Sequence, residues 1–189
     1  MRIHKNLKVI IGTIIISSMA TASAYAAWTT TTSTPNKLPL TPIYEPEFYG
    51  SPSSSIASAV AVPAGTATFL TSGTTPSVIN KEGKTVYEKY GDTEAQGTSI
   101  LQNIEKQLAD QGLSMKDVIY LRVYVAPDAA KGGKFDYDGW FKAYAKFFNT
   151  KANPTKTARS TVGVASLVNA DWLIEIEAVA AYPSGHNQD

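Results

Sequence analysis

The chain has 189 residues, of which 43% are hydrophobic, 17% charged and 10% aromatic, and it contains two His and no Cys. This length predicts one domain with at most an appendage, and the apolar fraction suffices for a packed core. The absence of Cys excludes disulfides, thiolate zinc sites and Cys nucleophiles. His4 falls in a segment expected to be removed and His186 is near the end of the sequence. A Ser-His-Asp triad or a multi-His metal site is therefore not expected.

Residues 1–26 have the features of a secretory signal peptide. Three basic residues within the first eight precede a short apolar run over residues 9–16, and Ala24-Tyr25-Ala26 matches the pattern that signal peptidase accepts. An uncleaved anchor is the less favoured alternative, because a spanning helix needs about 20 apolar residues. We expect export to the periplasm or the medium, with no membrane attachment of the mature form.

Removal of this segment changes the charge balance of the protein. The segment carries three of the 17 basic residues and none of the 16 acidic ones, which leaves the mature chain with a net charge of −2. Binding of nucleic acid depends on basic surfaces that contact phosphates, and the sequence has no such footprint. No nucleic-acid partner is expected.

The rest of the sequence divides into an arm, a domain and a tail. Residues 27–55 are rich in Thr, Ser and Pro, which predicts an extended arm. The globular pattern begins at Ile56, so we expect the domain over residues 56–183 and a short tail over residues 184–189.

Two helices and five strands are predicted in the domain. One helix begins at Thr93, which is expected to form a capping box with Gln96, and it ends before a left-handed Gly112. A second, over residues 139–148, carries Trp140, Tyr144, Phe147 and Phe148 at helical spacing, which predicts an amphipathic helix with these aromatic residues in the core. Strands are predicted over residues 56–62, 66–72, 118–125, 159–165 and 173–181. The first two are expected to form a hairpin, and a polar loop follows them as far as Gly91.

This order of elements predicts an α+β fold with two helices on one face of a largely hairpin-connected sheet. The last strand places Glu175, Glu177 and Val179 on the other face. A bare sheet face is expected to be covered by self-association of the protein.

Arg159 and Glu175 are the leading candidates for chemistry. They lie on consecutive predicted strands, and antiparallel neighbours would bring them close together. One interpretation is a structural ion pair. The other is a clamp, in which the planar guanidinium binds a small carboxylate through two hydrogen bonds and the Glu orients a water or transfers a proton. Ser72-Gly73, at a strand end, offers a hydroxyl and a backbone N–H to a ligand or forms a plain turn.

Four segments of the domain resemble the RidA (YjgF/YER057c/UK114) family, and the resemblance extends from Ile56 to Tyr182. They are LTSG (70–73), NIEKQLADQGLSMKDVIYLRVYV (103–125), ARSTVGVASL (158–167) and IEIEAVAA (174–181). Each is weak alone, but four in this order and spacing are specific. The resemblance implies a chorismate-mutase-like α+β fold, assembled as a homotrimer with clefts between subunits.

Family members that are enzymes hydrolyse reactive 2-imino and 2-enamino acids, such as 2-aminoacrylate, to 2-oxo acids and ammonia without metal or cofactor. The resemblance implies that Arg159 binds the substrate carboxylate and that Glu175 helps to position the attacking water. Ser72 and Gly73 match the Ser-Gly that lines the family's cleft. Thr161 stands where the family often has Cys, and its backbone is expected to contact the ligand.

Two positions depart from the family pattern. Residues 55–58 lack the Tyr of a Pro-Tyr-Ser-Gln segment, and Phe141 stands near an Asn of many active members. The pocket is therefore expected to be more apolar. Two functions follow, an exported imine deaminase and a non-catalytic periplasmic binder of small carboxylates. An endoribonuclease is disfavoured because the mature chain is acidic and lacks the usual His pair.

Overall fold

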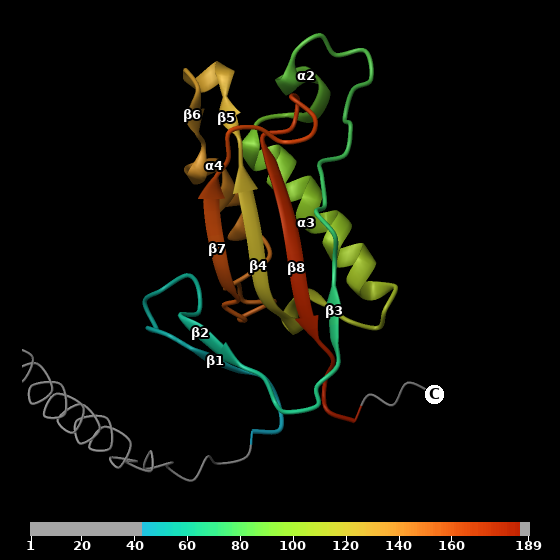
Figure 1. Ribbon diagram of the computed structural model, residues 1–189, viewed down its shortest axis with the longest axis vertical. Helices are drawn as coiled ribbons and strands as arrows, with labels where there is room; N and C mark the ends of the chain where they lie inside the picture. The colour runs from blue at the N-terminus through green and yellow to red at the C-terminus, as the bar shows by residue number, and fades with distance from the viewer. Residues whose placement is uncertain (1–42, 186–189) are drawn as a thin grey trace, which may run out of the picture. The chain divides into compact units, whose positions relative to one another are not determined.

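The computed structural model describes residues 43–185 (Figure 1). The chain divides into two units, residues 1–41 and 42–189, and the description below concerns the second. The predicted signal peptide, the first part of the arm and residues 186–189 lie outside the described residues. Among residues 43–185, no helix has both the length and the apolar character needed to cross a membrane.

A four-stranded mixed sheet forms the centre of the domain. Its strands are β3 (Thr68–Leu70), β4 (Val118–Val125), β7 (Ala158–Gly163) and β8 (Ile174–Ala181). Their spatial order is β3-β8-β4-β7, with β8 antiparallel to both of its neighbours and β4 parallel to β7 (Figure 1). The β-branched and aromatic residues that dominate β4 suit an interior strand, because such side chains fit a sheet that is covered on one face.

Helices α3 (Thr93–Ala109) and α4 (Tyr137–Tyr144) lie together on one face of this sheet (Figure 1). The apolar stripe of α3, made by Ile100, Leu101, Ile104 and Leu108, is fully buried against strand side chains and α4. The predicted α+β class, with two helices on one face, is confirmed.

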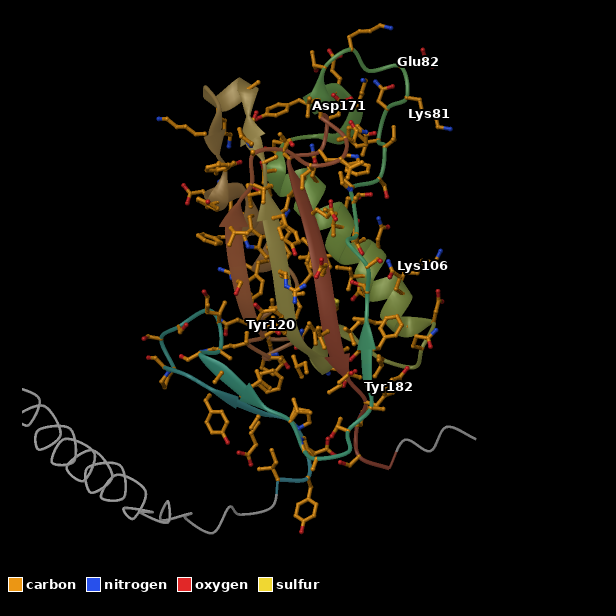
Figure 2. All side chains as sticks on the ribbon, viewed as in Figure 1. Lys81, Glu82, Lys106, Tyr120, Asp171 and Tyr182 are labelled. Carbon is orange, nitrogen blue, oxygen red and sulfur yellow. The ribbon has the colours of Figure 1, made fainter. Side chains whose placement is uncertain are left out.

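The other face of the sheet carries no helix from residues 43–185 and is called the open face below. It presents Arg122, Glu175 and Glu177, because side chains alternate along each strand, with Arg122 of β4 opposite Glu177 of β8 and Tyr124 opposite Glu175. Arg122 and Glu177 form an ion pair on this face. Tyr120, labelled in Figure 2, lies on the same face and donates a hydrogen bond of 2.6 Å from its hydroxyl to Ser160 Oγ on β7.

The hairpin predicted over residues 56–72 is wrong. Strand β2 (Ala59–Ala61) pairs instead with β1 (Glu47–Tyr49), which belongs to the predicted arm. Strand β3 pairs with β8, the last strand in the sequence. In this position the side chain of Phe69 packs against the main core. Alternation of residue types predicted the strands but did not distinguish a local partner from a distant one.

The predicted capping of α3 is also wrong at its start. The N-cap is Asp92, whose carboxylate accepts a hydrogen bond of 2.9 Å from the backbone N–H of Ala95. Gln96 is fully buried, and its side-chain oxygen accepts a 2.8 Å hydrogen bond from the backbone N–H of Leu173. Gln96 therefore connects α3 to the segment before β8. The predicted left-handed Gly112 is confirmed, with φ 71°.

Several short elements were not predicted. The polar loop contains helix α2 (Val86–Tyr90), which begins with a capping box between Thr85 and Glu88. The second predicted helix, α4, begins two residues earlier than expected, at Tyr137. The remaining elements are the 3₁₀ turns Met115–Asp117 and Ala129–Lys131 and the strands β5 (Pro127–Asp128) and β6 (Lys134–Phe135).

Candidate functional site

Arg159 lies on the helix-covered face of the sheet. On β7 it pairs in register with Leu121 of β4, whose side chain is completely buried. The guanidinium carbon is 4.3 Å from the ring centre of Tyr144, 4.7 Å from that of Phe141 and 5.5 Å from that of Trp140. Helix α4 supplies all three rings, and their negative faces stabilise the cation.

The charge of Arg159 has no carboxylate partner among the described residues. Its Nη1 is buried and has no hydrogen-bond acceptor within that part of the chain, and the ion pairs found there involve other residues. Burial lowers the pKa of Arg159, because removal from water disfavours the charged form. A half-buried cation without an opposite charge favours the binding of an anion beside it.

A cavity of about 260 Å³ lies beside this guanidinium. Its lining is mostly aromatic and apolar, and comprises Ser55, Phe141, Tyr144, Ala145, Phe148, Asn149 and Arg159. The Tyr144 hydroxyl donates a hydrogen bond of 3.2 Å to the backbone carbonyl of Ser55, which joins the wall of α4 to the segment before β2. Burial raises the pKa of Tyr144 to about 12, so this phenol stays protonated at neutral pH.

Phe141 and Thr161, two of the predicted ligand contacts, also lie near Arg159. Phe141 remains 43% exposed and forms part of the cavity wall. The Thr161 hydroxyl accepts a hydrogen bond of 3.2 Å from the indole N–H of Trp140. Thr161 therefore holds one of the rings that flank the guanidinium.

Trp140, Tyr144 and Phe148 were predicted as core residues and not as site residues. They are buried, so the core prediction holds, but they also shape the surroundings of Arg159. Aromatic residues at helical spacing indicate a buried helix face, and nothing in that spacing shows which charged residue of a distant strand the face will contact.

Glu175, Ser72 and Gly73 form a second group, at the open face. Glu175 pairs in register with Tyr124. A methyl group built on Gly73 would lie 1.9 Å from Glu175 Oε1, so the carboxylate rests directly against the Gly73 backbone. Backbone hydrogen bonds in both directions between Thr74 and Ile176, of 2.8 and 3.1 Å, fix this approach. Ser72 is exposed beside it.

The expectation that Arg159 and Glu175 lie on neighbouring antiparallel strands is wrong. Strand β4 lies between β7 and β8, and β7 pairs with it in parallel. Arg159 aligns with buried Leu121, whereas Glu175 aligns with Tyr124, which is three residues further along β4 and on the opposite face. Within one copy of the chain, the candidate site therefore consists of two separate groups.

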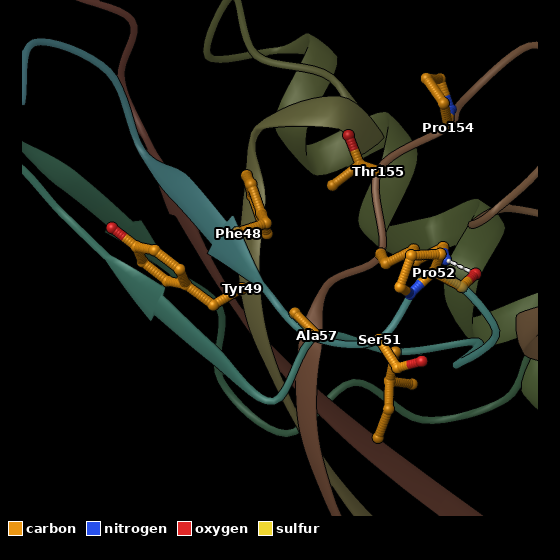
Figure 3. A pocket seen from close by; sticks show the side chains of 10 residues that line it. Phe48, Tyr49, Ser51, Pro52, Ala57, Pro154 and Thr155 are labelled. Atoms are coloured by element: carbon orange, nitrogen blue, oxygen red, sulfur yellow. Dashed lines mark hydrogen bonds between the residues drawn. The ribbon is translucent and has the colours of Figure 1, made fainter.

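A larger cavity, of about 390 Å³, lies between the β1–β2 hairpin and residues 154–156 (Figure 3). None of the predicted site residues lines it. Lys156, the one charged side chain among the described residues that line it, donates a hydrogen bond of 2.6 Å to the Pro52 carbonyl. The cation of this cavity therefore already has a hydrogen-bond acceptor, whereas Nη1 of Arg159 has none among the described residues.

The fold and these two groups define a small α+β domain with a cavity beside a guanidinium on one face of its sheet and a carboxylate on the other. Residues 54–182 match the family described as endoribonuclease L-PSP. Because the match covers most of the chain, the protein belongs to this family, which is also called RidA or YjgF. The match agrees with the extent of the resemblance found in the sequence.

Solved structures of the same family are similar to this chain. The Rid-family protein YyfB of Yersinia pestis has a TM-score of 0.55 at 23% identity, covering 73% of this chain and 99% of that one. The YjgF gene product of E. coli has a TM-score of 0.47 at 33% identity over 64% of this chain and 84% of that one. E. coli TdcF with bound serine has a TM-score of 0.49 at 25% identity over 74% and 94%. None of the curated proteins matches the chain.

Proposed function

We propose that the protein hydrolyses reactive 2-imino and 2-enamino acids to 2-oxo acids and ammonia, with the substrate carboxylate bound by Arg159. The observation that carries this proposal is the guanidinium itself, which lines a cavity while its Nη1 has no acceptor among the described residues. A carboxylate is the planar anion that a guanidinium binds through two parallel hydrogen bonds.

The reaction mainly requires that the protein orient the substrate and the attacking water. A 2-imino acid has an electrophilic C=N carbon, and a 2-enamino acid acquires one when a proton moves from its nitrogen to C3, so water can add to this carbon without a covalent intermediate on the protein. The water oxygen bonds to that carbon as the C=N π bond breaks, and one water proton passes to the nitrogen to give a carbinolamine. The second proton then passes from the hydroxyl to the nitrogen, and ammonia leaves as the C–N bond breaks and the C=O bond forms. Glu175 would orient this water and transfer its protons from the oxygen to the substrate nitrogen. Holding the two reactants in position supplies a large part of the rate enhancement.

One copy of the chain does not present both groups to one substrate, because Arg159 and Glu175 lie on opposite faces of the sheet. We therefore propose that each site combines Arg159 of one copy with Glu175 of another, in a homotrimer. The open face supports such assembly, since Leu70 and Val162 expose large apolar side chains, at 63% and 45%. Self-association would remove this surface from water.

A non-catalytic binder of small carboxylates is the second candidate function. The cavity at Arg159 favours this function. Its described lining residues supply a cation for a carboxylate and aromatic rings, but no Asp or Glu that could act as a catalytic acid or base. An RNA-cleaving activity is not proposed, since the two His are at positions 4 and 186 and the mature chain would be acidic.

We also propose that the protein acts outside the cytoplasm, on the basis of the signal-peptide features of residues 1–26. N-terminal sequencing of the protein recovered from the periplasm or the medium is expected to begin at Ala27. Recovery in the cytoplasm with an intact first segment would contradict this proposal.

The deaminase proposal is tested by generating 2-iminobutyrate or 2-aminoacrylate in situ and following its disappearance together with ammonia release. Wild type should accelerate both, and Arg159→Ala should lower kcat/KM by about a hundredfold, because it removes the charged partner of a carboxylate. Lys142→Ala, an exposed substitution on α4, is the control and should match wild type. Binding of stable 2-oxo acids without any acceleration would favour the binder, and equal rates for wild type and Arg159→Ala would contradict the role of Arg159.

A further inference from the structure

We infer that the cavity beside Arg159 selects acids with a branched or aromatic apolar side chain over the smallest acids. The inference rests on the proposed function in one respect, namely that Arg159 binds the carboxylate. It adds the substrate class, which follows from the walls of the cavity.

The walls are aromatic and already ordered. Tyr144 and Phe148 are stacked with ring centres 4.9 Å apart, and Trp140 meets Tyr144 edge-on at 5.8 Å. Phe141, Tyr144, Ala145 and Phe148 follow the spacing i, i+3, i+4 and i+7, which places them along one side of α4 and its final turn. A ligand would therefore meet a preformed apolar surface, and its binding would cost little conformational entropy of the wall side chains.

The polar groups of the cavity are few and are partly occupied. The Ser55 carbonyl already accepts a hydrogen bond from the Tyr144 hydroxyl, and Asn149, five residues past Tyr144 and beyond the end of the helix, is the other uncharged polar side chain of the lining besides Ser55 and Tyr144. A carboxylate bound by Arg159 would thus leave the substituent on its neighbouring carbon against aromatic rings. Each methylene buried on such a surface increases affinity, by about tenfold in a well-fitting pocket.

The size of the cavity agrees with this interpretation. A volume of 260 Å³ corresponds to the liquid volume of about nine waters, which is more than a two- or three-carbon acid displaces. An acid with a branched or aromatic side chain fills more of this space and removes more apolar surface from water. The smallest acids would leave it largely hydrated.

Calorimetric binding of a series of stable 2-oxo acids tests the inference on the purified protein. The series is pyruvate, 2-oxobutyrate, 4-methyl-2-oxopentanoate and phenylpyruvate. We expect the dissociation constant to fall by at least about tenfold from pyruvate to the branched acid. Ala145→Phe places a ring in the cavity and should bring the ratio of the dissociation constants of pyruvate and the branched acid down to nearly one. Lys142→Phe adds the same ring to an exposed position of α4 that does not line the cavity, and should keep the advantage.

Equal affinities across the series, tighter binding of pyruvate, or an advantage that survives Ala145→Phe would overturn the inference. Thermal unfolding of both variants establishes that they are folded. The experiment does not read turnover, so its result is independent of the deaminase assay. If the larger acids bind more tightly but no hydrolysis occurs, this inference holds and the proposed reaction is wrong. If hydrolysis occurs but affinity does not depend on side-chain size, the proposed reaction holds and this inference is wrong.

Discussion

Arg159 and Glu175 lie on opposite faces of the central sheet, with strand β4 between the strands that carry them. The two side chains have different surroundings. Arg159 has aromatic rings and a cavity, and Glu175 has the bare backbone of Gly73. The separation makes a shared site between copies of the chain directly testable.

Mixed assemblies should recover activity that neither parent variant has. When Arg159→Ala and Glu175→Ala chains are co-expressed in equal amounts, random assembly into trimers should give about one intact site in four. We therefore expect about a quarter of the wild-type rate of imine hydrolysis from the mixture. The matched control mixes two preparations of the Arg159→Ala chain, which should stay inactive. Inactivity of the mixture, with trimers present by light scattering, would contradict a site shared between copies.

Gly73→Ala should displace the Glu175 carboxylate without unfolding the protein. The added methyl would meet the far end of a flexible side chain, at 1.9 Å from Oε1, so that side chain has to move. We expect kcat/KM to fall by about a hundredfold with little change in thermal stability, because a displacement of this size misaligns the water. In a Glu175→Ala background the same substitution should have no further effect. An additional loss in that background would mean that Gly73 acts in some other way.

Replacement of Arg159 by Met should stabilise the fold while abolishing carboxylate binding. Nη1 is buried with no acceptor in residues 43–185, and burial lowers the pKa of the guanidinium, so the charge is unfavourable in the unliganded state. We expect the free energy of unfolding in urea to rise by about 1 kcal/mol. Arg159→Lys, which keeps a charge, serves as the control and should show no such gain. A less stable Met variant would show that the three aromatic rings stabilise the cation by more than its burial destabilises it.

Tyr144→Phe should lower stability by about 1 kcal/mol near pH 8, because the variant loses the hydrogen bond to the Ser55 carbonyl while keeping the ring over Arg159. Burial raises the pKa of Tyr144 to about 12, whereas the unfolded chain ionises near 10. A raised pKa means that protonated Tyr144 contributes stability, fully below pH 10, which is lost as the pH rises toward 12. Urea unfolding between pH 8 and 12 should therefore show the difference between wild type and Tyr144→Phe narrowing above pH 10. A constant difference across that range would argue against the raised pKa.

Much of this protein could be predicted from its sequence, because the signals are local. The apolar stripe of α3, the left-handed Gly112 and the strand over residues 118–125, rich in β-branched and aromatic residues, depend on a few neighbouring residues each. The α+β class follows from the order of such elements. The ordered segments around Arg159 and Glu175 were sufficient to recognise the family.

Only the tertiary structure decided which strands are neighbours. The insertion of β4 between β7 and β8, and the pairing of β3 with β8, depend on contacts between residues far apart in the sequence. Alternation along a strand shows that it has two different faces, but it does not show which strand lies beside it or which helix covers it. For that reason the sequence suggested Arg159 and Glu175 as candidates, whereas their division between two faces of one sheet, and the aromatic rings around Arg159, were decided by the tertiary structure.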